Sequence, residues 1–320
     1  MTKLYRGNSV AVILPCYNEV DVIASVIAAF RAALPEAAVY VFDNNSSDGT
    51  AAAALAAGAI VRHVPQRGKG NVVRRQFADV DADVYVMADG DGTYDASQSR
   101  ILVDTLLDGG LDMVVGTRRA IGDGEEYRPG HVLGNKVLTG TVANIFGRGF
   151  SDMLSGYRVL SRRFVKSFPA LSRGFEIETE LTIHALELRA PYAEVPTAYG
   201  SRIEGSTSKL NTIRDGFSIL EMILRLFARE RPRQLYLSVG IVTAIISLLL
   251  AIPVFIDYFE TGLVPRFPTA ILSGLGIIAS LILGAMAAIL DSVVTGRREA
   301  KRLRYLEIPA PRVEARQAQS

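Results

Sequence analysis

The carboxylates of Asp89 and Asp91 are the feature of this sequence with the clearest chemical meaning. They flank Gly90 and directly follow the apolar segment 83–88, which has the character of a buried β-strand. Two carboxylates at this spacing can share a hard divalent cation, Mg²⁺ or Mn²⁺, that also bridges a diphosphate. The intervening glycine would let a backbone or a sugar come close. An isolated Asp-x-Asp can also be a solvated turn. The residues around Asp89 and Asp91 therefore decide between a metal site and a turn.

Two further polar clusters follow apolar strand-like segments. Residues 17–19 come after the segment 9–14, and residues 43–48 come after the segment 38–42. In a parallel sheet the carboxyl ends of strands share one edge, where ligands bind. The sequence therefore predicts that the three clusters form one site.

The elements that would hold this site alternate along the chain. We expect strands at 9–14, 38–42, 59–63, 83–88 and 113–116, and helices at 21–34, 50–57, 70–78 and 98–107. This alternation predicts an α/β fold with a mostly parallel, Rossmann-like sheet and helices on both faces. The net charge of +2 argues against a nucleic-acid binder, and the single cysteine excludes an intramolecular disulfide.

The last third of the chain changes character. Residues 235–256 and 267–290 contain no charged side chain, and each exceeds the roughly 20 residues that span a bilayer. The pattern favours a two-helix transmembrane hairpin over a pair of buried core helices. Arginines precede the first run and basic residues follow the second, whereas the loop 257–266 carries two acids and one arginine. The positive-inside rule predicts a multi-pass protein of the cell membrane with the catalytic domain and both termini cytoplasmic.

The hairpin divides the chain into segments. We expect a catalytic domain at 1–209, an amphipathic helix at 210–233 and a basic tail at 291–320. The amphipathic helix could lie in the lipid headgroup plane, or pack on the catalytic domain or a neighbouring subunit.

The polar motifs occur in an order that resembles a known family. They are Pro15-Cys16-Tyr17-Asn18-Glu19, the Asp43–Thr50 stretch, Gly68-Lys69-Gly70-Asn71 and Asp89-Gly90-Asp91-Gly92-Thr93. Over about residues 8 to 230 the chain resembles family 2 glycosyltransferases of the GT-A fold. With the two apolar spans it resembles the polyprenyl-phosphate hexose synthases of that family.

The resemblance implies a binding site for a nucleotide-sugar donor, with a UDP-sugar favoured and a GDP-sugar as the alternative. Pro15 and Glu19 would flank the nucleoside, and Asp43 would accept a hydrogen bond from the base. The implied donor-binding set is Pro15, Tyr17, Glu19, Asp43, Asn45, Lys69 and Asp89, with Asp89 and Asp91 as ligands of Mg²⁺ or Mn²⁺. For Gly68–Asn71 a surface turn before a helix is the alternative.

The acceptor implied by the resemblance is a polyprenyl phosphate. Its phosphate is ionised at neutral pH and needs cations that orient it, not a general base. The residues assigned to this phosphate are Arg118, Arg128, Arg202, Ser206 and Lys209, of which the last three belong to a segment similar to the family's Arg-x-x-Gly-x-Ser-Lys element. A solvated basic loop, or a surface ion pair for Arg118, is the alternative.

The catalytic set we predict is Asp91, Arg118 and Glu178. Glu176 and Glu178 could bind sugar hydroxyls, or merely be acids that favour a helix N-terminus. Two features depart from the family pattern: Thr93-Tyr94 follow the acids where many relatives have a smaller or amide residue, and the chain has no tryptophan, which excludes the Gln-x-x-Arg-Trp element of processive synthases.

The function expected from these features is metal-dependent, inverting transfer of one sugar to a polyprenyl phosphate at the cytoplasmic membrane face. Transfer to a hydroxyl of a lipid or glycan, with Glu178 as base, is the alternative among enzymes. A catalytically silent membrane component is the alternative from another class. A homo-oligomer is left open.

Overall fold

A computed structural model describes residues 3–120, 140, 150–171, 174, 176–200, 228 and 231–312. The chain forms two compact units. Unit 1 contains residues 1–217 together with 300–320, and unit 2 contains residues 218–299.

A seven-stranded sheet forms the centre of unit 1, in the order β3-β2-β1-β4-β6-β5-β7. The strands are β1 Val10–Cys16, β2 Ala38–Asp43, β3 Ile60–His63, β4 Val84–Met87, β5 Met113–Ala120, β6 Arg158–Ser161 and β7 Tyr192–Tyr199. Every pairing is parallel except those of β6, which runs antiparallel to both β4 and β5. The mostly parallel sheet expected from the sequence is confirmed.

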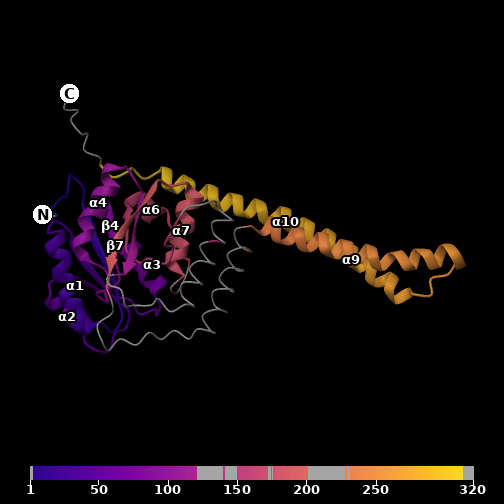
Figure 1. Ribbon diagram of the computed structural model, residues 1–320, viewed down its shortest axis with the longest axis horizontal. Coiled ribbons are helices and arrows are strands. Elements are labelled where there is room, and N and C mark those ends of the chain that lie inside the picture. Colours follow the sequence, from indigo (N-terminus) through magenta and orange to yellow (C-terminus); the bar gives the residue numbers. More distant parts are fainter. Residues whose placement is uncertain are drawn as a thin grey trace, which may run out of the picture. The chain divides into compact units, whose positions relative to one another are not determined.

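Helices cover both faces of this sheet (Figure 1). They are α1 Val20–Ala33, α2 Thr50–Ala56, α3 Lys69–Asp79, α4 Ser99–Asp108, α6 Arg162–Ser167 and α7 Ile177–Leu188. Helix α1 contacts α2 and α4, whereas α3 contacts α6 and α7. The inner strands read as continuous apolar runs because both faces are covered: the four residues of β4 are all buried.

The C-terminal segment 300–312 packs on unit 1. The ammonium of Lys301 lies 2.6 Å from a carboxylate oxygen of Glu187, and the hydroxyl of Tyr305 donates to Asp112 Oδ2 at 2.5 Å. The backbone N–H of Arg312 donates to the side chain of Asn8, whose amide donates back to the Arg312 carbonyl. Asn8 and Asp112 precede β1 and β5, so the segment binds at the amino-terminal edge of the sheet. Residues 300–312 of the expected basic tail are therefore part of unit 1.

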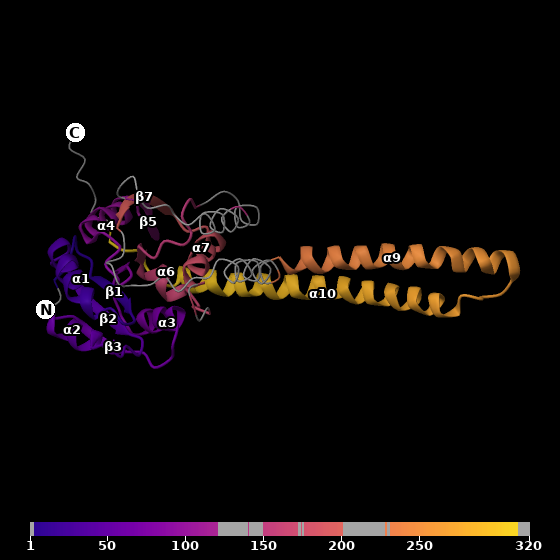
Figure 2. The same ribbon diagram turned by 60° about the horizontal axis from the view of Figure 1, so that its bottom comes forward.

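Unit 2 contains two long antiparallel helices, α9 Pro232–Thr261 and α10 Phe267–Leu306, of which α10 continues into unit 1 (Figure 2). Both are long and apolar enough to cross a membrane by length and composition. They approach closely where glycines face the other helix: a β-carbon on Gly240 would lie 3.3 Å from Leu283, and one on Gly276 would overlap Ser247. The helical hairpin is thus confirmed, and α10 runs 16 residues past the predicted span end at residue 290. Most of the predicted amphipathic helix at 210–233 lies outside the described residues.

Candidate active site

Asp89 and Asp91 lie at the carboxyl edge of the sheet, directly after β4. One carboxylate oxygen of Asp91 accepts hydrogen bonds from the backbone N–H and the hydroxyl of Thr93, at 3.2 and 2.7 Å. Packing requires a glycine at position 90, which the sequence alone did not indicate. A β-carbon on Gly90 would overlap the sulfur of Cys16 at the end of β1. Burial raises the pKa of the Cys16 thiol, so this sulfur is a neutral packing group.

Lys69, the first residue of α3, lies between two carboxylates. Its ammonium is 2.5 Å from Asp89 Oδ1 and 2.5 Å from Glu178 Oε1, and its side chain is 9% exposed. Burial alone would lower the pKa of Lys69, but Asp89 and Glu178 more than offset this and raise it above its usual value. The structure therefore brings together Lys69 and Asp89 of the predicted donor-binding set, the second also a predicted metal ligand, with the predicted catalytic residue Glu178.

Glu178 lies in the first turn of α7 and is buried. Its second oxygen, Oε2, has no hydrogen-bond partner in the part of the chain that the structure describes. An N-terminal helix position favours a carboxylate, as the sequence indicated. The ion pair with Lys69 also places Glu178 beside Asp89, through the cation that the two acids share.

Asp43, at the end of β2, has a buried carboxylate. Its Oδ2 accepts from the backbone N–H of Ser46 and contacts His63 Nδ1, each at 3.3 Å, while its Oδ1 has no partner within the described segments. An unsatisfied buried acceptor is costly, so this oxygen is suited to a ligand N–H. Asn45 instead donates to the backbone carbonyl of Pro65 at 2.8 Å, which ties together the loops after β2 and β3.

The remaining predicted donor residues cluster at the end of β1. Pro15 belongs to β1 itself, and Tyr17 after it is 43% exposed. Glu19 is the last residue before α1, and its backbone N–H donates to the hydroxyl of Thr50 at 2.8 Å. The three polar clusters, residues 17–19, 43–48 and 89–91, thus lie at one edge of the sheet, as predicted.

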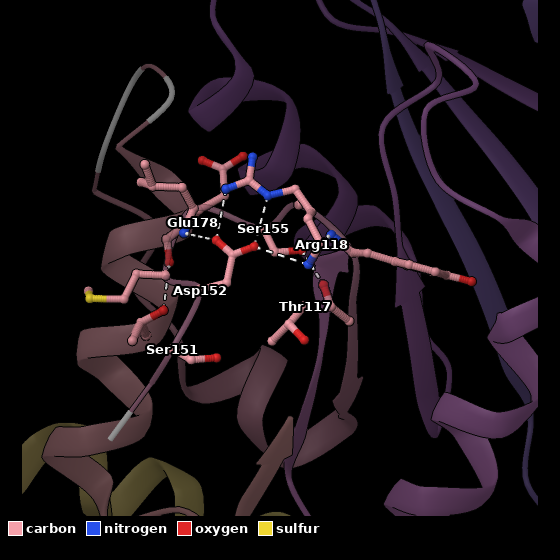
Figure 3. Close-up of polar contacts among 12 residues, drawn as sticks. Thr117, Arg118, Ser151, Asp152, Ser155 and Glu178 are labelled. Carbon is pink, nitrogen blue, oxygen red and sulfur yellow. Dashed lines mark hydrogen bonds and ion pairs between the residues drawn. The ribbon is translucent and has the colours of Figure 1, made fainter. Parts of the chain in front are cut away.

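Arg118 on β5 forms a two-pronged ion pair with Asp152 (Figure 3). Its Nε and Nη2 each lie 2.8 Å from a carboxylate oxygen, and its backbone N–H donates to the same group at 3.3 Å. Burial would raise the pKa of Asp152, but Arg118 holds it below its usual value. Asp152 therefore fixes the orientation of Arg118.

The loop from Ser151 to Tyr157 supplies site residues that we did not predict. A β-carbon on Gly156 would lie 2.9 Å from Asp89 Oδ2 and 3.3 Å from the Lys69 ammonium, so the loop backbone borders the acids directly. The fully buried Arg158 holds the loop by donating to the carbonyls of Ser155 and Met153. The sequence signal was a Ser-Gly-Tyr-Arg run before a short apolar segment, with a charged residue where a strand should be apolar.

The chemistry of this edge suits a divalent cation. Among the described residues no three His, Cys, Asp or Glu side chains cluster as a closed metal site. Two carboxylate groups with hard oxygen donors are what Mg²⁺-like ions use when substrate phosphates complete the coordination. Of the residues predicted to bind the acceptor phosphate, only Arg118 is described; Arg128, Arg202, Ser206 and Lys209 lie outside the described residues.

Comparison with known proteins defines the class. Residues 11–168 match the family model described as "Glycosyl transferase family 2". Over 307 residues the chain is 34% identical to the glycosyltransferase AglJ of Haloferax volcanii, covering 94% of this chain and 99% of the relative. The chain belongs to glycosyltransferase family 2, and its fold is the GT-A fold.

Two other relatives are informative. Polyprenol monophosphomannose synthase of Mycolicibacterium smegmatis is 27% identical over 239 residues, covering 67% of this chain and 86% of that protein. The crystal structure of glucosyl-3-phosphoglycerate synthase from Mycobacterium tuberculosis, in complex with Mn²⁺ and UDP-glucose, superposes with a TM-score of 0.57 at 26% identity. That superposition covers 70% of this chain and 79% of the synthase.

Proposed function

We propose that this glycosyltransferase moves one sugar from a nucleoside diphosphate sugar, a UDP-sugar in the first instance, to the phosphate of a polyprenyl-phosphate lipid. The observation that carries the proposal is the ion pair of Glu178 with Lys69. A hydroxyl acceptor requires a general base, and the carboxylate predicted for that task is neutralised by a lysine. An ionised phosphate needs no base.

The donor side of the proposal rests on the carboxyl edge of the sheet. The open Oδ1 of Asp43 would accept an N–H from the base, and Asp89 and Asp91 would hold Mg²⁺ or Mn²⁺. The bound metal would offset the negative charge that develops on the departing nucleoside diphosphate. The Mn²⁺ and UDP-glucose complex of the mycobacterial synthase supports both assignments.

The reaction would be a single displacement. An oxygen of the lipid phosphate attacks the anomeric carbon and forms the new C–O bond. The bond from that carbon to the donor diphosphate breaks, and the nucleoside diphosphate leaves with the electron pair. One displacement inverts the anomeric centre, and no proton has to be removed from the acceptor. Arg118, oriented by Asp152, would hold the acceptor phosphate, together with Arg128, Arg202, Ser206 and Lys209.

The membrane part of the proposal rests on the two apolar helices and on the charge of their flanks. Insertion of the hairpin with both ends in the cytoplasm would bring the catalytic unit to the cytoplasmic face of the cell membrane. A lipid acceptor explains why one chain carries both a sugar-transfer site and such helices. The similarity to a polyprenol monophosphomannose synthase supports the same acceptor class.

The test uses the full chain in detergent with labelled UDP-sugars, undecaprenyl phosphate and Mn²⁺. We expect a labelled lipid that is cleaved by mild acid, and no product in EDTA. Product that persists in EDTA would refute the metal assignment. Label on a diacylglycerol, ceramide or glycan hydroxyl in place of the lipid phosphate would favour the alternative acceptor, and neither transfer nor donor hydrolysis would favour a silent component.

Three variants sharpen the test. Asp91→Asn should abolish turnover while membrane insertion is unchanged. Glu178→Gln, assayed at saturating Mn²⁺ and donor, separates the acceptor classes, because a base would be lost only for a hydroxyl acceptor. Arg202→Ala should raise the KM for the lipid far more than the KM for the donor, and an equal effect on both would contradict its assignment.

A further inference from the structure

The triplet Asp89–Lys69–Glu178 places a fixed positive charge against a predicted metal ligand. The ammonium lies 2.5 Å from an oxygen of each acid, and the exposed fractions of the Asp89, Lys69 and Glu178 side chains are 28%, 9% and 5%. Asp89 is thus the partly open end of the triplet, and Glu178 is its buried end. The backbone at Gly156 closes the side next to Lys69 and Asp89.

This arrangement acts oppositely on the two charged ligands of the reaction. A divalent cation that approaches Asp89 is repelled by the neighbouring ammonium, and little water is present to screen that repulsion. A diphosphate is attracted by the same ammonium. Once the diphosphate is present, its negative charge compensates Lys69, and the repulsion of the metal is relieved.

The contact with Glu178 explains how Lys69 can stay in place both before and after a metal binds to Asp89. If Asp89 turns to a metal, the ammonium keeps Glu178 as a buried partner, so its charge is not left uncompensated. Glu178 is therefore a positioning residue: it acts through Lys69, and in this assignment it does not touch the reacting atoms.

We propose that Lys69, held by Glu178, makes the binding of the divalent metal and of the nucleoside diphosphate mutually dependent. The metal alone binds weakly because the ammonium repels it, and each ligand binds more tightly in the presence of the other. This inference rests on the proposed donor and metal assignments. Its consequence is that the metal is retained with the donor and is released easily once the nucleotide product has left.

The test measures Mn²⁺ binding to the full chain in detergent by the electron paramagnetic resonance signal of free Mn²⁺, with and without UDP or GDP. For the wild type we expect the nucleotide to tighten Mn²⁺ binding by about 100-fold, within the usual range of coupling between sites. In Lys69→Met, Mn²⁺ alone should bind roughly tenfold tighter and the nucleotide effect should fall to about tenfold, because the repelling charge is gone and only the direct contact of metal and diphosphate remains.

Glu178→Gln should have the opposite sign. Lys69 then pairs with Asp89 alone, so Mn²⁺ without nucleotide should bind more weakly than in the wild type, while the nucleotide effect is retained. Lys166→Met is the matched control. Lys166 is also partly buried in unit 1, but its ammonium donates to the carbonyls of Phe77 and Val80, and both binding measurements should match the wild type.

The outcomes separate the inference from the proposed function. A wild type that binds neither UDP nor GDP with Mn²⁺ refutes the donor assignment. A wild type with strong coupling that Lys69→Met retains refutes the role of Lys69 and leaves the donor assignment standing. Should Lys69→Met fail to fold, the double variant Lys69→Met/Glu178→Gln removes both charges of the buried pair; weak Mn²⁺ binding and full coupling in that variant would also overturn the inference.

Discussion

The stability of unit 1 should depend on pH through His184. This side chain, on α7, is buried, and its Nε2 lies 3.1 Å from the hydroxyl of Ser167. The rings of Phe164 and Phe168 pack against it edge-on, at 5.0 and 5.3 Å between centroids. Burial, helped by the positive charge of Lys301 and opposed by Glu187, lowers the pKa of His184 to about 3. The folded protein therefore holds this imidazole neutral.

The sign and size follow from the linkage between proton binding and folding. A histidine in an unfolded chain has a pKa near 6.5. Below that pH, His184 is therefore protonated in the unfolded chain but stays neutral in the folded chain. The stability that neutral His184 provides is complete above pH 6.5 and is lost as the pH falls from 6.5 towards 3. At pH 5 the loss is about 1.5 pKa units, or about 2 kcal/mol. For a unit of this size that corresponds to roughly 4 to 8 °C in the unfolding midpoint.

The assay compares thermal unfolding of the wild type and His184→Gln in detergent, by circular dichroism at pH 7.5 and pH 5. The variant should be less stable at pH 7.5 because it loses the aromatic contacts. Its deficit should shrink by about 2 kcal/mol at pH 5. His63→Gln is the control, because water reaches 61% of the His63 side chain. Equal pH dependence in the wild type and His184→Gln would refute the reasoning.

Two further changes test packing. Gly90→Ala should lower kcat at least about 100-fold, because its β-carbon overlaps the Cys16 sulfur and displaces both acids of the proposed metal site. A rate near that of the wild type would show that the structure around Gly90 accommodates the methyl group without moving the acids. Tyr305→Phe should lower the free energy of unfolding by about 1.5 kcal/mol through loss of the hydrogen bond to Asp112. Tyr40→Phe, which removes a hydroxyl with no hydrogen bond in the described structure, should stay within about 0.5 kcal/mol of wild type, and an equal loss in both variants would contradict a special role for Tyr305.

The elements of the first 116 residues could be predicted because their hydrophobic pattern is regular. Each expected strand and helix in that stretch is present, with ends shifted by four residues at most. Strands β6 and β7 were missed. The first has four residues and begins at the buried charge of Arg158, and the second contains Pro196, which an edge strand tolerates. Neither matches the apolar pattern on which the other predictions depended.

Some contacts of the candidate site could likewise be predicted from the sequence, and others could not. The meeting of Asp43 and Asp89 at one sheet edge follows from the parallel topology alone, so the sequence was sufficient. The pairing of Lys69 with Glu178 joins residues 109 positions apart and depends on how α7 packs beside α3. The two-pronged pair of Arg118 with Asp152 depends on the antiparallel return through β6. Such contacts are set by tertiary packing, and no local pattern records them.

The position of residues 300–312 against the amino-terminal edge of the sheet has a consequence for how the protein is made. Synthesis begins at the amino end, so Lys301, Tyr305 and Arg312 leave the ribosome only after both apolar helices have been translated. Until then Glu187 lacks its lysine and Asn8 lacks its backbone partner. A chain released before residue 300 would carry the carboxylates of the active site on an incompletely closed domain. Folding of unit 1 can therefore be completed only after the helical hairpin has been synthesised. Expression of residues 1–230 alone would yield a unit 1 that lacks the contacts of residues 300–312.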